Sequence, residues 1–351
     1  MLRSFEVAHQ FLPKPFDLDV LQSAVDRACT LQDRLDSDSL QKIVSTIRTL
    51  PSLPDLYQEL VAVMQSPAAS TETIVPIVSK DMAMVSKMLQ VVNSAFVGLR
   101  RMISRHAHAV ALLGLDTVKS LVLTLQVFRQ FEQDLSMPVP IDSLWRHGLA
   151  TASLARRIAE LDGVGSLGIQ RAFMAGLLRD IGVLVLATNF PDRFAEVMEQ
   201  AKIGGRPMAE VERGLLGTTE AEVGAYLLGI WSLDNAVVEA VAFYHAPASM
   251  RQSGFSLLSV VHVTNALEEV QDTTLSARAR TVIDQEYLGY CGLSSRLPIW
   301  REQCASRPPL RRLALQVPAK AAWSIFTTSV SLVYRRIPDP LFDGTTSCRG
   351  R

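Results

Sequence analysis

Two polar side chains of this sequence are predicted to face the protein interior, where together they could bind a metal ion. His147 falls on the apolar stripe of a helix predicted over residues 141–160. Asp180 falls in the next predicted helix, over residues 170–188, on the face that carries Leu177 and Leu184. Imidazole and carboxylate groups are common ligands of transition metals. A carboxylate that faces a core is unfavourable unless it is paired, hydrogen-bonded or bound to a cation, so Asp180 is the most unusual polar residue of the chain.

Both residues also have a purely structural interpretation. A histidine on an apolar helix face is often a hydrogen-bonded core residue. Asp180 could likewise be a structural carboxylate that accepts hydrogen bonds from His147 or from helix N-termini. The residues alone leave the metal site and the structural interpretation open.

The spacing of these residues resembles the HD superfamily of metal-dependent phosphohydrolases. About 30 residues after His147 comes the segment Gly-Leu-Leu-Arg-Asp-Ile-Gly, residues 176–182. In that superfamily the signature doublet is His-Asp, and an Asp on a later helix completes the ligand set. The resemblance implies that Arg179 stands at the position of the doublet's histidine, that Asp180 is its aspartate, and that Asn265 replaces the later aspartate.

These replacements argue against catalysis. The guanidinium of Arg179 is always charged, has no free lone pair and repels a cation. Asn265 is neutral and a weaker ligand than a carboxylate. A catalytic transition-metal site uses three or more protein ligands, and His147 and Asp180 supply two. We therefore predict that the chain is not an enzyme, with no catalytic residue, no bound metal and no cofactor.

Further segments resemble one branch of the superfamily, the HDOD (HD-related output) domain of bacterial signalling proteins. They are residues 50–54, 87–96, 109–115 and 221–228, together with Phe-Tyr-His at 243–245. At Glu220, HDOD sequences often carry His, which further weakens any metal site. The resemblance implies a non-hydrolytic output module whose partners are other signalling proteins, with a homodimer as a further option.

The N-terminal residues resemble the last strand and helix of a response-regulator receiver domain. A strand is predicted around Val7–Leu12, followed by Lys14-Pro15 and a helix that Asp17 opens. Lys14 matches the lysine that contacts the phosphorylated aspartate in that family. The aspartate and most of the sheet have no match here, so the resemblance implies a partial receiver of a two-component system that accepts no phosphoryl group.

The expected fold is mainly α: a multi-helix HD-like (HDOD) domain over residues 40–305, preceded by the strand-helix fragment of residues 1–35. Residues 36–39 are predicted to be a polar break between the two. After the break, apolar residues recur at helical spacing for more than 200 residues. Residues 306–351 have a mixed composition and are predicted to form a poorly specified tail.

The composition limits the cellular location and the kinds of partner that we expect for this protein. The 351 residues contain 35 Lys and Arg and 35 Asp and Glu, so no overall charge favours nucleic acid or an anionic membrane. No apolar run reaches the ~18 residues of a membrane span. The four cysteines are scattered without a zinc or disulfide pattern. We expect a cytoplasmic protein that binds neither nucleic acid nor a membrane.

Two other functions are considered beside the leading one. The first is an HD-type metal-dependent phosphodiesterase with a reduced ligand set of His147 and Asp180, joined by Glu220, His245 or His262. The second is a sensor that binds a nucleotide or another anion through Arg179, for which an internal ion pair with the neighbouring aspartate is the simpler explanation.

Overall fold

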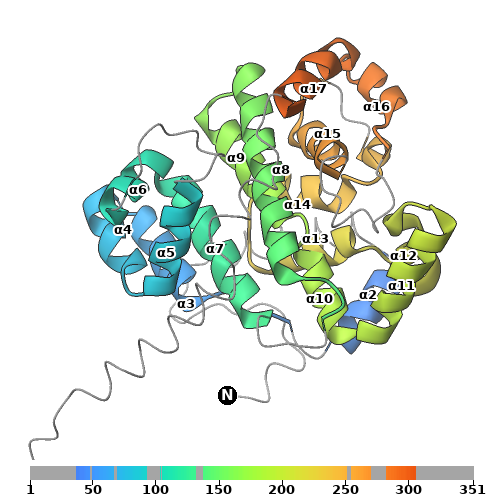
Figure 1. Cartoon of the computed structure of the whole chain (residues 1–351), viewed down its shortest axis with the longest axis horizontal. Helices are drawn as coiled ribbons and strands as arrows, with labels where there is room; N and C mark the ends of the chain where they lie inside the picture. The colour runs from blue at the N-terminus through green and yellow to red at the C-terminus, as the bar shows by residue number, and fades with distance from the viewer. Residues whose placement is uncertain are drawn as a thin grey trace, which may run out of the picture. The chain divides into compact units, whose positions relative to one another are not determined.

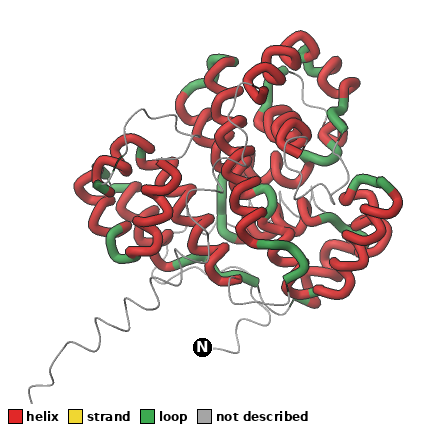
Figure 2. The backbone as a smooth tube through the Cα atoms, in the orientation of Figure 1, coloured by secondary structure: helices red, strands yellow, loops and turns green. Residues whose placement is uncertain are grey.

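The computed structural model describes residues 37–47, 50–66, 69–92, 103, 105–131, 137–250, 254–269 and 282–305. Every regular element in these ranges is a helix, and none of them is a strand (Figures 1 and 2). The mainly α fold is confirmed. The strand predicted at Val7–Leu12, the receiver-like Lys14 and the tail of residues 306–351 lie outside the described residues.

The first described helix begins directly after Ser37. The Ser37 hydroxyl accepts a hydrogen bond from the backbone N–H of Leu40 at 3.4 Å, which satisfies a donor that the first turn leaves open. The polar break predicted at residues 36–39 is wrong for Asp38 and Ser39, which lie in this helix. Serine and aspartate favour helix starts as strongly as loops, so their cluster is ambiguous in sequence.

Helices α3 to α6 pack against the longer α7. Leu115, at the start of α7, follows Gly114, whose positive φ of 78° ends α6 and lets the chain turn sharply. The helices of this group are α3 (Asp55–Met64), α4 (Thr71–Val78), α5 (Met82–Val92), α6 (His106–Leu113) and α7 (Leu115–Phe131), whereas the preceding α2 (Asp38–Thr46) packs against α13 (Glu220–Ile230) of the second group (Figure 1).

The second group of helices is built around α9, which packs against α7, α8, α14 and α15. The 21-residue α8 is the longest described helix, and it covers the span predicted around His147. The helices are α8 (Ile141–Leu161), α9 (Ser166–Leu178), α10 (Ile181–Asn189), α11 (Pro191–Gly204), α12 (Met208–Leu216), α13 (Glu220–Ile230), α14 (Asn235–Phe243) and α15 (Leu257–Glu269). A 3-10 turn, η2 (Pro247–Met250), lies between the last two.

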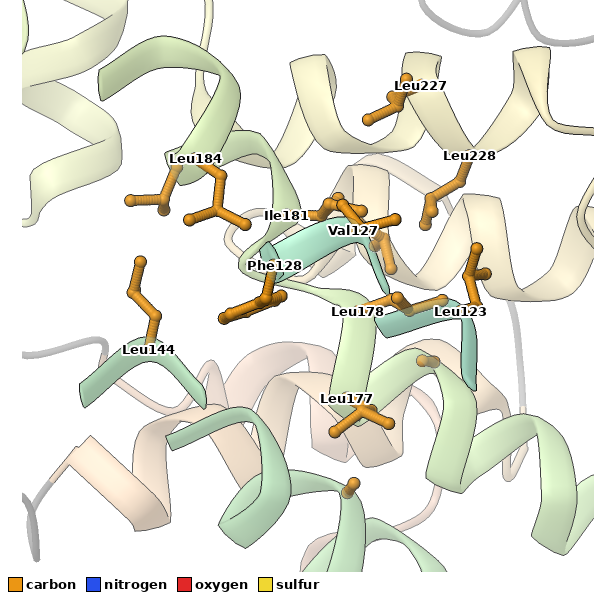
Figure 3. Packing of buried hydrophobic residues seen from close by; sticks show 14 of the residues in the cluster. Leu123, Val127, Phe128, Leu144, Leu177, Leu178, Ile181, Leu184, Leu227 and Leu228 are labelled. Carbon is orange, nitrogen blue, oxygen red and sulfur yellow. The ribbon is translucent and has the colours of Figure 1, made fainter. Parts of the chain in front are cut away.

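Three short elements close the described chain: α16 (Gln285–Tyr290), η3 (Ser294–Arg296) and α17 (Leu297–Ala305). Their apolar side chains belong to a cluster of their own with α8, α9 and α15. The remaining core is one continuous cluster, and Figure 3 shows its centre, where leucines of α9, α10 and α13 meet Val127 and Phe128 of α7.

The single helix predicted over residues 170–188 is wrong. The structure ends α9 at Leu178 and begins α10 at Ile181, with Arg179 and Asp180 as the joint between them. The apolar residues run on through both helices, so hydrophobic periodicity alone could not place the break.

Two glycines next to this joint allow the helices to approach closely. A Cβ on Gly176 would lie 2.8 Å from the backbone nitrogen of Ala152 in α8, and a Cβ on Gly182 would overlap the carbonyl oxygen of Glu220 in α13. Real Cβ atoms do not come this close to backbone. The glycines of residues 176–182 therefore set the spacing of α9 against α8 and of α10 against α13.

One described stretch, Ser166–Asn189, is long and apolar enough to cross a membrane, but most of it is buried inside the protein. Helices α6 and α7 would also be long and apolar enough if joined, but they are bent by 110° at their junction. Since α9 and α10 pack against other helices of the core, their apolar character is explained by the fold itself.

Candidate functional site

Arg179 and Asp180 form a buried ion pair at the joint between α9 and α10. Nη2 of Arg179 lies 3.0 Å from Oδ2 of Asp180, and Nε donates to the same oxygen at 3.3 Å. The side chain of Arg179 has no exposed surface, and that of Asp180 exposes 2%. The negative charge of Asp180 is therefore balanced by a cation that the chain itself supplies.

Asn265 and Tyr244 surround the same guanidinium from two other helices. Nη1 of Arg179 donates a hydrogen bond to Oδ1 of Asn265 in α15. Cζ of Arg179 lies 5.7 Å from the ring centroid of Tyr244, which follows the last residue of α14, within the range of a cation–π interaction. One arginine thus joins the α9–α10 joint to α14 and α15.

Tyr244 connects this ion pair to a second buried acid, Glu220. The Tyr244 hydroxyl donates to Oε1 of Glu220 at 2.9 Å. Nε2 of His245 lies 2.8 Å from the same oxygen, and the Tyr244 and His245 rings are in contact, with centroids 4.0 Å apart and planes tilted by 35°. Glu220 is 3% exposed, so these two neighbours replace part of the hydration that its carboxylate loses on burial.

Glu220 also opens α13, and a second acidic residue stabilises its position. The backbone N–H of Glu220 donates to Oε2 of Glu212 in α12 at 3.0 Å. The preceding residue, Thr219, forms a capping box with Glu222. The carboxylate of Glu212 at a helix N-terminus is favoured by the helix dipole.

His262 is a structural histidine in the neutral state. Its Nε2 accepts the backbone N–H of Asp284 at 2.8 Å, and its Nδ1 lies 2.7 Å from the carbonyl oxygen of Tyr244. Because a carbonyl only accepts, Nδ1 carries the proton. Burial, the main cause, lowers the pKa of His262. Both ring nitrogens are used, so the inclusion of His262 among the candidate metal ligands is wrong.

The sequence singled out five positions of an HD-type site, and the structure brings some of them into direct contact and others only into the same region. Arg179, Asp180 and Asn265 are in direct contact, and Glu220 is linked to them through the tyrosine of α14. His147 is buried in α8, which packs against both α9 and α15. The internal ion pair expected for Arg179 is confirmed, and its burial disfavours the anion sensor.

Sequence reasoning missed two residues of this network. Glu212 lies in α12, a helix that was not predicted, and nothing in its local sequence indicates a buried acid. Tyr244 is part of the Phe-Tyr-His segment noted for its resemblance, but its three roles depend on how α14 meets α9, α13 and α15. Neither residue could be assigned without the helix packing.

The arrangement offers little to a metal ion. Within the ranges that the structure describes, no group of three or more His, Cys, Asp or Glu side chains is placed to hold one. The guanidinium of Arg179 lies against Asp180, the carboxylate that the HD resemblance assigns to the metal, and its charge repels a second cation. The absence of a bound metal, cofactor or catalytic residue stays a prediction.

The family model of the HDOD domain matches residues 50–247, more than half of the chain. The chain belongs to the HDOD family. This family is related to the HD superfamily, as the sequence resemblance implied. The match contains α8 to α14, and with them His147, Arg179, Asp180 and Glu220, whereas Asn265 follows it.

Three solved structures share the HDOD fold. An HDOD domain protein with unknown function from Geobacter sulfurreducens has a TM-score of 0.61 at 20% identity, over 87% of this chain and 97% of that one. A candidate phosphohydrolase from Shewanella amazonensis SB2B has a TM-score of 0.58 at 21% identity, over 77% of this chain and 94% of that one. A candidate signal transduction protein from Marinobacter aquaeolei VT8 has a TM-score of 0.59 at 22% identity, over 88% of this chain and 66% of that one. At these identities the likeness concerns the fold alone.

An uncharacterized protein of Treponema pallidum (strain Nichols) is 24% identical to this HDOD protein over 251 residues, which are 72% of the chain. The chain spans 46% of that relative's length.

Proposed function

We propose that this HDOD protein is a non-catalytic signal-transduction output module that acts by binding other proteins. The observation that carries the proposal is the Arg179–Asp180 pair. The cation bound to the Asp180 carboxylate is a guanidinium of the chain, held also by Asn265 and Tyr244. In this proposal the helices of an HD-type centre are kept, and the place of the metal ion is taken by the guanidinium of Arg179.

The energetics support a structural role for this arginine. A buried charge is strongly unfavourable without its partner, so Arg179 and Asp180 stabilise the fold only together. An exchangeable metal would have to displace the guanidinium, break its hydrogen bonds and leave a second positive charge nearby. A helical framework that is intact but binds no metal can still bind other proteins. We therefore propose that this protein binds other signalling proteins in the cytoplasm, as part of two-component signalling.

The experiment is to measure metal content and hydrolysis on the same purified chain. We expect manganese, iron and zinc far below one equivalent after incubation with each metal and dialysis, and no release of product from bis(p-nitrophenyl) phosphate above a protein-free blank. Metal-dependent hydrolysis that disappears in Asp180→Ala would overturn the proposal in favour of the HD-type phosphodiesterase with a reduced ligand set.

A further inference from the structure

The last described segment, residues 282–305, forms a small core that is separate from the main one. Its apolar side chains cluster with residues of α8, α9 and α15, and this cluster shares no buried member with the larger core. α17 packs on α8 and α15. The buried members are Leu154, Ala155, Ile158, Ala159, Ala172, Val260, Val263, Tyr287, Leu288, Cys291, Leu293, Leu297 and Trp300.

Trp300 is the largest buried side chain in this segment, at 1% exposure. Its ring meets Phe255 edge-on, with centroids 6.4 Å apart. A large aromatic side chain in a desolvated pocket is the type of residue that dominates the binding energy of helix-in-groove complexes.

Asp162, directly after α8, binds two side chains of this segment. Its Oδ2 accepts a hydrogen bond from Nε1 of Trp300 at 2.9 Å, and its Oδ1 lies 2.9 Å from Nη2 of Arg296. The Asp162 side chain is 3% exposed, whereas Arg296 is 47% exposed. One buried carboxylate therefore recognises an arginine and a tryptophan four residues apart, with the arginine at the edge of the contact.

We propose that this face of α8, α9 and α15, with Asp162 at its end, is a docking surface for an amphipathic helix that presents an arginine followed four residues later by a tryptophan. In the structure, α17 with Arg296 occupies the surface. A partner helix of the same chemistry would replace α17, cover the same apolar side chains and pair with Asp162. This inference rests on the proposed function, because it names the kind of partner that the module binds.

The separation of the two cores makes the exchange physically reasonable. Release of residues 282–305 would break the hydrogen bond from the Asp284 N–H to Nε2 of His262 and the contacts of the small cluster, but it would remove no buried member of the main cluster. Such a release is a local opening that needs less free energy than unfolding the whole protein. The exposed face would then combine an apolar surface with an unpaired carboxylate at its end. Both would favour rebinding of a helix that satisfies them.

Cys291 provides a probe of this opening, because its thiol is buried at 6% exposure within the small core. In a chain with Cys29, Cys304 and Cys348 replaced by Ser, Cys291 is the remaining thiol. We expect a thiol reagent to label it through local opening, so that Trp300→Ala raises the rate roughly a hundredfold or more. Leu184→Ala, in the main core, should leave the rate unchanged under native conditions.

Binding is tested on the same cysteine-replaced full chain with a fluorescent peptide of residues 294–305 in which Cys304 is Ser. We expect the peptide to bind the Trp300→Ala chain at least about tenfold more tightly than the Trp300-containing chain, because the surface is vacated more often. A peptide with Arg296→Ala and Trp300→Ala should not bind. If Trp300→Ala is unfolded by circular dichroism, Trp300→Phe, which removes only the Nε1 donor and part of the ring, takes its place in both experiments.

Two outcomes would overturn the inference. One is labelling of Cys291 that Leu184→Ala accelerates as much as Trp300→Ala, since the segment would then open only with the whole protein. The other is equal binding of the native and the doubly substituted peptide. Neither outcome touches the metal and hydrolysis measurements that decide the proposed function.

Discussion

Oδ2 of Asp180 accepts two hydrogen bonds from its own sequence neighbour, at 3.0 Å from Nη2 and 3.3 Å from Nε of Arg179. Adjacent residues of a continuous helix point in directions about 100° apart and do not face each other. These two side chains meet at the joint between α9 and α10, where the regular helix is interrupted. The ion pair and the break in the helix therefore lie at the same two residues.

Arg179→Ala should destabilise the protein strongly. The substitution leaves the Asp180 carboxylate buried without its cation and Asn265 without its donor, so we expect a loss of about 3–5 kcal/mol in the free energy of unfolding. Urea denaturation at pH 7 measures it. Arg171→Ala is the matched control, because Arg171 pairs with Asp234 in a half-exposed contact that should contribute no more than about 1 kcal/mol.

The same variant separates the ion pair from the anion sensor. If Arg179 binds a nucleotide, its removal should abolish that binding and leave the stability nearly unchanged. We expect the reverse, with a large loss of stability and, by isothermal titration calorimetry, no nucleotide binding to the unsubstituted chain. Unchanged stability together with a lost nucleotide affinity would refute the ion-pair account.

Much of the helical architecture is predictable because it depends on local periodicity. The stripe that includes Leu144 and His147 predicts α8 to within one residue at its end, and the buried carboxylate of Asp180 correctly predicts a compensating partner. The division of residues 170–188 into α9 and α10 was not predictable in this way. Arg179 in the joint contacts Asn265, which lies 86 residues later in the chain, and local periodicity contains no information about such a long-range contact.

The resemblance to HD proteins identified the right positions but not their present contacts. Glu220 was singled out as the replacement of a histidine ligand, and the structure adds that it accepts hydrogen bonds at the junction of α13 and α14. His262 has the residue type of a metal ligand, yet its two nitrogens serve backbone groups. Residue type indicates what a side chain can bind, whereas the packing decides what it does bind.

Gly182→Ala should be among the most destabilising single-methyl additions in the chain. The new Cβ would overlap the Glu220 carbonyl oxygen and lie 2.7 Å from the backbone nitrogen of Gly224. Both are backbone atoms, which move only if α10 and α13 separate, so we expect a loss of about 3 kcal/mol or more by urea denaturation. Gly214→Ala is the control: its Cβ would meet nothing within 4 Å, and in helix α12 it should stabilise by about 0.5–1 kcal/mol. Equal effects at both positions would show that the close approach of α10 and α13 is not maintained in solution.

The free energy of unfolding should fall as the pH is lowered from 7 to 5, in part because of His262. Burial lowers the pKa of His262 in the folded protein, so below its usual value of about 6.5 the unfolded chain binds a proton that the folded chain does not. Stability from this group is fully present above pH 6.5 and is lost as the pH falls toward the folded pKa, by at most about 1.4 kcal/mol for each pH unit.

Urea denaturation of His262→Gln across this range measures that contribution, and the variant should show a shallower dependence on pH. His108→Gln is the matched control, since His108 is exposed on α6, and it should keep the slope of the unsubstituted protein. If His262→Gln also keeps that slope, the neutral His262 does not contribute to the pH dependence.

Restoring the two replaced ligand positions should create a metal site. Arg179→His with Asn265→Asp removes the internal cation and places an imidazole and a carboxylate around Asp180, in a framework that also holds His147. The four side chains would match the ligand types that bind first-row transition metals. We expect close to one equivalent of manganese, iron or zinc by elemental analysis, against far below one in the unsubstituted chain. Adding His147→Ala should remove the metal again, while His108→Ala in the same background should not. A folded double variant without metal would contradict this prediction, because it would mean that the packing of α8, α9 and α15 does not bring the four side chains to coordinating distance of one ion.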